Sequence, residues 1–170
     1  MCEPVRIHWK SMTGNLFESQ APQESTSEWF IAHCDGGSRG NPGPSGYGAV
    51  VEDAQGQVVA RLSKFLGIQT NNFAEYSGLL AVLQWALENG KARLRVVSDS
   101  ELMVKQMKGQ YKVKSQGLLP LYQEARRLAA RLDEFEMRHT LRGGNKEADR
   151  LANVAMDEGM GKRQGIGSRE

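Results

Sequence analysis

The chain has 170 residues, of which 39% are hydrophobic and 25% charged, so we expect one compact domain with its own core. The net charge of +2 divides into −2 over residues 1–29 and +4 over the remainder, which leaves a phosphate-bearing partner and an ordinary solvated surface both open. No apolar run approaches the roughly 18–20 residues of a membrane span, no secretory signal is evident, and two cysteines are too few for a disulfide framework or a zinc cluster. We expect a cytoplasmic protein with no membrane partner.

The first strand of the domain is predicted to end at an aspartate inside a glycine-rich stretch. Residues 1–28 lack a hydrophobic period and predict a flexible N-terminal extension, with the folded domain over 29–159 and a flexible tail over 160–170. WFIAHC predicts a central strand that ends at Asp35. The stretch DGGSRGNPGPSGYGAV then surrounds this carboxylate with residues typical of turns and of close backbone approach.

Two strands and a helix are predicted next. GYGAVVEDAQGQVVARLSKFLG contains two strand-like runs that are split at Asp53–Gly56, which predicts a hairpin. NNFAEYSGLLAVLQWALENG has apolar residues at steps of three and four, which predicts a helix. Asn72 and Glu75 resemble a capping box at its start, and Gly90 is placed to end it.

The second half of the domain alternates strands and helices. RLRVVSD predicts a buried strand that ends at Asp99, and Ser100 is placed to cap a short helix through about Lys108. LLPLYQEARRLAARL predicts an amphipathic helix, DEFEMRHT a strand, and NKEADRLANVAMDEG a closing helix. This order predicts a mixed sheet with helices packed on its faces, and sites in such sheets form at the carboxyl ends of central strands.

Four carboxylates stand at the ends of predicted elements, namely Asp35, Glu75, Asp99 and Asp149. Each one alone has a structural explanation, since a first-turn acid favours a helix dipole and a strand-end aspartate favours a turn. If the four converge, they would repel one another unless a cation neutralised them. Hard oxygen ligands without a Cys or His cluster favour Mg²⁺ or Mn²⁺, and two such ions about 3.5–4 Å apart can cleave a phosphodiester.

Four blocks of the sequence resemble the signatures of type 1 ribonuclease H (ribonuclease HI): DGGSRGNPGPSGYGAV, TNNFAEYSGL, SDSELMVKQMKGQYKVK and HTLRGGNKEADRLAN. The resemblance covers about residues 30–157. It implies an α/β ribonuclease H-like fold, with a five-stranded mixed sheet of three antiparallel N-terminal strands and two further parallel strands, and helices on both faces. It implies an endonuclease that cuts the RNA strand of RNA–DNA hybrids and leaves 5′-phosphate and 3′-hydroxyl ends.

The resemblance also implies roles for particular residues. It makes the four acids the ligands of two Mg²⁺ ions, with Mn²⁺ able to substitute, and places Asp35 between the two ions. His139 matches a histidine that assists proton transfer or product release, on a loop made mobile by Gly143 and Gly144. The implied substrate contacts are Ser38, Gly40, Asn41, Thr70, Asn71, Asn72, Ser100, Lys112 and Lys114. For Asn71 and Asn72, helix capping is the alternative.

The sequence also departs from that family. It lacks the basic helix that some members insert between the third and fourth acids, so it is similar to the shorter branch, and the KGQYKVK segment with Lys112 and Lys114 is interpreted as a replacement contact. Ile68 stands where some relatives have an arginine, and Glu101 is either an extra carboxylate beside the site or a first-turn helix acid. Broader substrates, including double-stranded RNA and RNA–DNA junctions, and a catalytically weak duplex-binding module stay open. We expect a monomer.

The glycines beside Asp35 receive a functional interpretation from this resemblance. Turn geometry explains one or two of them, and close approach of a duplex backbone to Asp35 would explain the rest. Replacing Gly36 or Gly40 with Val is then expected to impair cleavage more than thermal stability.

Overall fold

The structure, a computed structural model, describes residues 28–164, with side chains described as far as residue 161. The predicted N-terminal extension, apart from residue 28, and residues 165–170 of the predicted tail lie outside this range. The last helix continues to Gln164, five residues beyond the end of the predicted domain at residue 159. Within the described range, no helix combines the length and the apolar character needed to cross a membrane.

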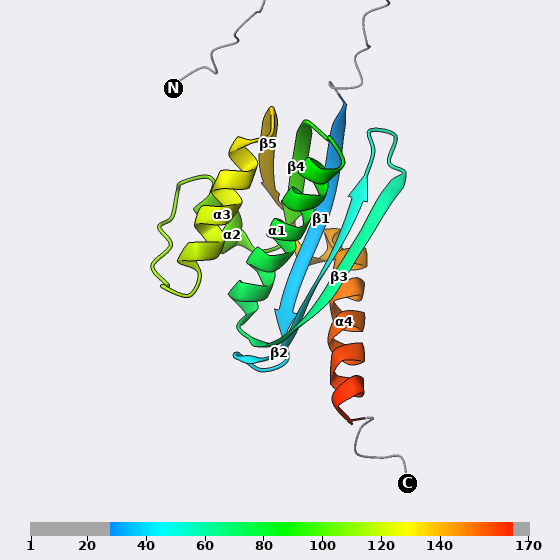
Figure 1. Ribbon diagram of the computed structural model, residues 1–170, viewed down its shortest axis with the longest axis vertical. Helices are drawn as coiled ribbons and strands as arrows, with labels where there is room; N and C mark the ends of the chain where they lie inside the picture. The colour runs from blue at the N-terminus through cyan, green and yellow to red at the C-terminus, as the bar shows by residue number, and fades with distance from the viewer. Residues whose placement is uncertain (1–27, 165–170) are drawn as a thin grey trace, which may run out of the picture.

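The domain is built on a five-stranded mixed sheet in the order β3-β2-β1-β4-β5 (Figure 1). Its strands are β1 (Trp29–Ser38), β2 (Gly43–Glu52), β3 (Val58–Gln69), β4 (Arg93–Ser98) and β5 (Glu134–His139). The pairs β1–β2 and β2–β3 are antiparallel, and β1–β4 and β4–β5 are parallel. The predicted fold class is therefore confirmed, including the central place of the first strand.

Helices cover both faces of this sheet (Figure 1). They are α1 (Asn71–Glu88), α2 (Glu101–Met107), α3 (Leu119–Ala130) and α4 (Lys146–Gln164), with a 3₁₀ turn at Arg142–Gly144. Neighbouring residues of a strand face opposite sides of a sheet. In β1, Gly36 faces the backbone of α1, whereas Gly37 faces Met156 of α4, so the two long helices lie on opposite faces. The core fills the α1 side, where Tyr76, Leu79 and Leu83 are fully buried.

The start of α1 differs from the sequence prediction. Thr70 is the N-cap residue, and its hydroxyl accepts a hydrogen bond from the backbone N–H of Phe73 at 3.2 Å. The predicted capping box of Asn72 with Glu75 is wrong, because both residues already lie inside the helix. The end of the helix is as predicted, since Gly90 follows the C-cap with a φ of 66°, a conformation that glycine adopts without strain.

The glycine-rich stretch is largely strand. β1 does not end at Asp35 but continues to Ser38, and the chain returns as β2 from Gly43. Asp35 consequently lies within the β1–β2 ladder, opposite Gly48. On its other side, the β1–β4 ladder stops one residue earlier, at the pair Cys34 and Ser98. The sheet therefore opens between β1 and β4 at the level of Asp35.

Candidate active site

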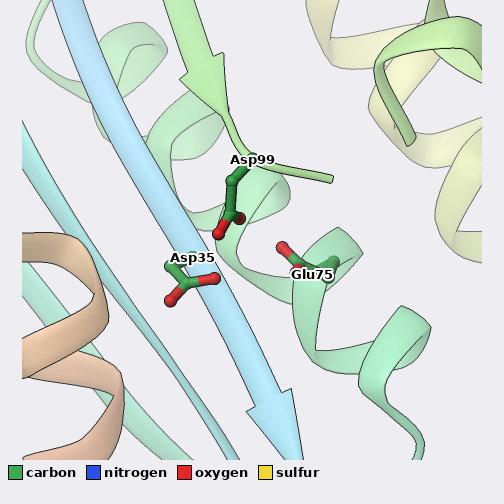
Figure 2. Close-up of side chains that lie close together, drawn as sticks. All are labelled: Asp35, Glu75 and Asp99. Atoms are coloured by element: carbon green, nitrogen blue, oxygen red, sulfur yellow. The ribbon is translucent and has the colours of Figure 1, made fainter. Parts of the chain in front are cut away.

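Three carboxylates meet where β1 and β4 separate. Asp35 follows Cys34 in β1, and Asp99 follows Ser98 in β4, so the parallel register carries both acids to the same level. Glu75 reaches them from α1 (Figure 2). One carboxylate oxygen of each acid lies within 4.8 Å of those of the other two. The predicted convergence of these three acids is thus a feature of the structure.

The fourth acid comes from the other face of the sheet. Asp149 lies in the first turn of α4, and its side chain is exposed. It lines the same cavity of about 370 Å³ as the other three acids, although it is not part of the group within 4.8 Å. Asn145, just before α4, donates its side-chain amide N–H to the backbone carbonyl of Cys34 at 2.8 Å. The backbone carbonyl of Asn145 accepts from the N–H of Asp149 at 3.0 Å. These two bonds hold the start of α4 against β1.

Two glycines permit the helices to approach Asp35. A Cβ atom at Gly36 would lie 2.5 Å from the carbonyl oxygen of Ala74, beside the backbone of Glu75. A Cβ atom at Gly48 would lie 2.5 Å from the backbone nitrogen of Ala152 in α4. Real Cβ atoms do not come so close to backbone atoms, so only glycine fits at either position. At Gly36 the glycine therefore serves helix packing, so Gly36→Val is expected to lower stability as well as cleavage.

Gly40 has a different reason to be glycine. It lies in the turn between β1 and β2 with a φ of 99°, which side chains other than hydrogen rarely tolerate. Its carbonyl accepts a hydrogen bond from the hydroxyl of Ser38. A Val at this position would strain the turn, so it too would lower stability.

Burial and mutual repulsion disfavour negative charge in this group of acids. Burial first, then the charge of Asp99 and the proximity of Asp149, raise the pKa of Asp35 from 3.8 to about 8. Burial likewise raises the pKa of Glu75 well above its ordinary value, assisted by the charges of Asp35 and Asp99 and opposed by the Gly36 N–H and Arg142. Without a cation, the group cannot hold all its negative charge at neutral pH.

The acids fit a divalent cation. The Oε2 atom of Glu75 is buried and has no hydrogen-bond partner within the described residues. A buried carboxylate oxygen without a partner is costly unless a ligand supplies one. All donors in the group are carboxylate oxygens, the ligands that Mg²⁺ and Mn²⁺ prefer.

His139 lies at the rim and not in the cavity. It ends β5, is exposed, and pairs in register with Ser98, the residue before Asp99. The chain then turns through Thr140, whose N–H donates to the carbonyl of Ser98 at 2.9 Å. His139 is not among the residues that line the acid cavity. The structure places it one strand away from the acids, on the side of β4.

Several predicted substrate contacts gather at the mouth of the cavity, where Ser38, Asn71 and Asn72 line it. The side-chain oxygen of Asn71 accepts from the N–H of Ser38 at 2.7 Å, and the side-chain oxygen of Asn41 accepts from the N–H of Asn71 at 3.1 Å. These bonds tie the β1–β2 turn to the start of α1. They also fix each amide so that its nitrogen is left to donate, because within the described residues neither nitrogen has a partner.

Other predicted contacts cap helices or lie outside the acid cavity. Thr70 and Ser100 cap α1 and α2, with Ser100 accepting from the N–H of Met103 at 3.3 Å. Lys112 and Lys114 line a second cavity, of about 510 Å³, over α2 and the segment that follows it. Asn72 lines both cavities and so connects them.

The two departures noted in the sequence are surface features. Glu101 does not join the acid cavity but pairs with Lys105 at 2.7 Å, from the first turn of α2. This agrees with its interpretation as a first-turn helix acid. Ile68, near the end of β3, is 52% exposed. It does not line either of the two cavities.

Two arginines line the acid cavity, and neither is among the site residues assigned from the sequence. Arg142 is almost fully exposed, and its Nε lies 4.0 Å from Oδ2 of Asp99. Arg39 lies in the β1–β2 turn and reaches the residues of α4 that continue from Asp149. Neither position carries a spacing signal, because a turn and a 3₁₀ segment bring the two arginines there.

Comparison with known proteins places these features in a family. A family model described as reverse transcriptase-like matches residues 33–155, from β1 to α4. The bifunctional protein Rv2228c of Mycobacterium tuberculosis is 48% identical over 128 residues, which are 75% of this chain and 35% of that protein. This chain therefore spans about a third of the length of the first curated relatives it matches. A protein named ribonuclease H from Pelobacter propionicus is 31% identical over 155 residues, covering 83% of this chain and 92% of the relative.

Solved structures agree with the sequence relatives. The N-terminal RNase H domain of Rv2228c has a TM-score of 0.78 and 45% identity, and the match covers 81% of this chain and 99% of that one. LC11-RNase H1, solved in complex with an RNA/DNA hybrid, has a TM-score of 0.74 and 35% identity, with 77% of this chain and 99% of that one covered. Both matches extend over nearly the whole of the solved chain.

Proposed function

Because the chain belongs to the ribonuclease HI family, we propose that it is an endoribonuclease that hydrolyses the RNA strand of RNA–DNA hybrids and leaves 5′-phosphate and 3′-hydroxyl ends. The observation that carries this proposal is the group of Asp35, Glu75 and Asp99, with their carboxylate oxygens within 4.8 Å and one buried oxygen without a partner. The relative LC11-RNase H1, solved with an RNA/DNA hybrid, supports the choice of substrate.

The four acids are assigned to cation binding. Asp35, Glu75 and Asp99 offer oxygens at one point, and Asp149 offers a further carboxylate from α4 into the same cavity. Two Mg²⁺ ions, for which Mn²⁺ can substitute, supply an activated water and a centre of positive charge for phosphodiester cleavage when bound. The protein's own part is to hold four carboxylates together in a partly buried place. Without the ions, burial and the neighbouring acids disfavour the charged form of Asp35 and raise its pKa.

His139 is assigned to proton handling or product release. An imidazole is able to gain and lose a proton near neutral pH, and an exposed one can exchange that proton with water. Its position opposite Ser98 in the β4–β5 ladder puts it on the Asp99 side of the cavity. In the following turn, a Cβ atom at Gly143 would meet nothing within 4 Å, whereas one at Gly144 would overlap the hydroxyl of Thr140.

Recognition of the hybrid is assigned to the minor groove. The bases present mostly acceptors there, and an RNA strand adds its 2′-hydroxyls. Asn41 and Asn71 are suited to this surface because their amide oxygens are occupied by backbone N–H groups and their amide nitrogens are left to donate. Ser38 and Asn72 line the same cavity as Asn71, Gly40 precedes Asn41 in the β1–β2 turn, and Thr70 and Ser100 cap α1 and α2.

The second cavity extends this surface. Lys112 and Lys114 bring positive charge to it, and Tyr111 presents an aromatic ring that is 51% exposed. A duplex that lies over the acids and over Asn72 would reach these lysines next, since Asn72 lines both cavities. We assign the segment as a backbone contact that substitutes for the missing basic helix. The protein is expected to act as a monomer in a reducing cytoplasm.

A cleavage assay with three labelled duplexes tests the substrate. The RNA–DNA hybrid is expected to be cut, while a DNA duplex of the same sequence is not. A double-stranded RNA of that sequence distinguishes a strict hybrid nuclease from one with broader substrates. Cutting of the RNA duplex at the rate of the hybrid would contradict hybrid specificity, and binding of all three without any cutting would favour a catalytically weak duplex-binding module.

A further inference from the structure

The lining of the acid cavity also contains positively charged residues. Of the residues that line it, Arg39 and Arg142 carry positive charge. Arg142 lies beside Asp99, and Arg39 lies in the β1–β2 turn, four residues beyond Asp35. An extended strand rises about 3.3 Å per residue, so Arg39 is about 13 Å along the chain from the central acid. The two arginines therefore reach the cavity from different elements, Arg142 from the 3₁₀ turn and Arg39 from the β1–β2 turn.

Contacts with α4 fix the position of the Arg39 guanidinium. Its Nη1 atom pairs with Asp157, and Nη2 lies 3.4 Å from the side-chain oxygen of Asn153. Asn153 in turn donates its amide to the carbonyl of Asp149 at 2.9 Å. Residues 149, 153 and 157 are four apart and share one face of the helix. A row along α4 therefore leads from the fourth acid to Arg39.

This arrangement suits the binding of a polyanionic strand along α4. The scissile phosphate has to lie at the acids, so the same strand has to leave the cavity past one or other end. The phosphates beside the scissile one extend beyond the acids and their cations, so a guanidinium where the strand leaves can pair with one of them. Arg39 retains guanidinium N–H groups beyond those used on α4, and its side chain is 36% exposed.

We propose that Arg39 binds a phosphate of the strand that is cut, next to but distinct from the scissile one, and holds that strand in register along α4. The proposal rests on the proposed hybrid cleavage. In this role Arg39 is a positioning residue for the cut strand, and Asp157 and Asn153 orient its guanidinium. The ligand is a non-bridging phosphate oxygen, so the contact carries no base preference.

Steady-state kinetics on the hybrid test the role in binding. Arg39→Ala is expected to raise KM about fivefold with little change in kcat, and to make the salt dependence of log KM shallower by about one unit. Arg39→Lys keeps the charge and is expected to recover part of the loss. Arg61→Ala is the matched control, because Arg61 also pairs with a carboxylate of α4, Glu147 at 3.6 Å, but does not line the cavity. Equal KM and salt slope in the wild type and Arg39→Ala would overturn the proposal.

The Asp157→Asn variant separates binding from packing. It removes the negative charge of the ion pair but keeps a side-chain oxygen that can still accept from and orient the guanidinium, so it is expected not to raise KM. If Asp157→Asn raises KM as much as Arg39→Ala does, the pair acts by holding the turn on α4, and the phosphate contact is refuted.

A substrate series locates the phosphate. Single methylphosphonate linkages, which are uncharged, are placed one at a time in the RNA strand. One non-scissile linkage is expected to raise the KM of the wild type, and the same linkage is expected to have no further effect on Arg39→Ala. Additive effects at every linkage would contradict the proposal. Failure of the wild type to cut any hybrid would instead refute the proposed function, so the two failures are distinguishable.

Discussion

Gly48 lies opposite Asp35 in the β1–β2 ladder, and its missing side chain is the space that the first turns of α4 occupy. Asp149 stands on this helix and lines the acid cavity together with Asp35. The residue across the ladder from the central acid therefore determines how near the fourth acid can come. Gly36 performs the corresponding task on the opposite face for α1 and Glu75.

Replacement of Gly48 is expected to affect stability and activity together. In Gly48→Val, the side chain would meet Leu151 and the backbone of Ala152, so α4 has to move outward. We expect a loss of about 3 kcal/mol in the free energy of unfolding, measured by urea denaturation. Gly161→Ala is the control on the same helix, since a Cβ atom there meets nothing within 4 Å. It is expected to be neutral or stabilising by up to about 1 kcal/mol, and equal losses in the two variants would contradict the packing argument.

The raised pKa of Asp35 predicts that the free energy of unfolding of the cation-free protein depends on pH. The native state holds this proton up to about pH 8, whereas the unfolded chain releases it near pH 4, so the native state binds more protons between these values. The free energy of unfolding is therefore expected to fall as pH rises across this window. Asp35→Asn removes this contribution.

Thermal unfolding in EDTA at a series of pH values measures this effect. Asp35→Asn is expected to exceed the wild type by about 3 kcal/mol at pH 8 and to lose that advantage near pH 4. The exposed Asp133→Asn serves as the control and is expected to follow the wild type at every pH. A constant difference between Asp35→Asn and the wild type would show that Asp35 titrates normally.

Divalent cations are expected to stabilise the fold through Glu75. An ion that binds only the native state raises the free energy of unfolding by about 2.7 kcal/mol at a hundred times its Kd. Wild-type protein is expected to show a rise in Tm with Mg²⁺ or Mn²⁺, and Glu75→Gln a much smaller one, because it loses the buried oxygen that lacks a partner. An equal rise in Tm for the two proteins would place the ion elsewhere.

The paired substitution Lys112→Ala with Lys114→Ala is expected to weaken hybrid binding without affecting the chemical step. Both side chains are exposed on the second cavity and contact no acid of the site. KM is expected to rise and the salt slope to become shallower by about two units, while kcat stays the same. Lys64→Ala on β3 is the control, since this exposed lysine lines neither cavity. Unchanged salt dependence in the double variant would remove the segment from the interface.

The positively charged partner of Asp99 can be tested separately. Arg142 lies 4.0 Å from Asp99 and lowers the pKa of Glu75, so it partly neutralises the acids when no cation is bound. Arg142→Ala is expected to lower the Tm measured in EDTA at pH 8 more than the Tm measured with saturating Mg²⁺. Equal losses in the two conditions would mean that Arg142 does not act on the acids.

The sequence predicts the elements, and the family resemblance implies that Asp35 and Asp99 meet with the other two acids at one site. Asp35 and Asp99 each follow a strong apolar run, and the parallel pairing of these runs sets them side by side. The alternation of strands and helices likewise predicts the mixed sheet. These features are local or follow from the rules of sheet topology.

Other parts depend on tertiary distances that a sequence does not contain. The glycines at 36 and 48 look like turn residues until the helices that pack on them are placed. Thr70 caps α1 instead of Asn72, and Asn71, the first helical residue, bonds to Ser38 and Asn41 of the β1–β2 connection. Arg39 and Arg142 reach the cavity from a turn and a 3₁₀ segment, whose side-chain directions no periodicity predicts.

The central claim is that the acids cleave RNA in a hybrid with the help of divalent cations. Its most direct test compares wild type with Asp35→Asn, both shown to be folded by circular dichroism, on a hybrid whose RNA strand is end-labelled. Wild type with Mg²⁺ is expected to produce fragments with 5′-phosphate and 3′-hydroxyl ends, and to produce none in EDTA. Asp35→Asn is expected to be inactive in both conditions. Cleavage by Asp35→Asn, or by wild type in EDTA, would contradict the account.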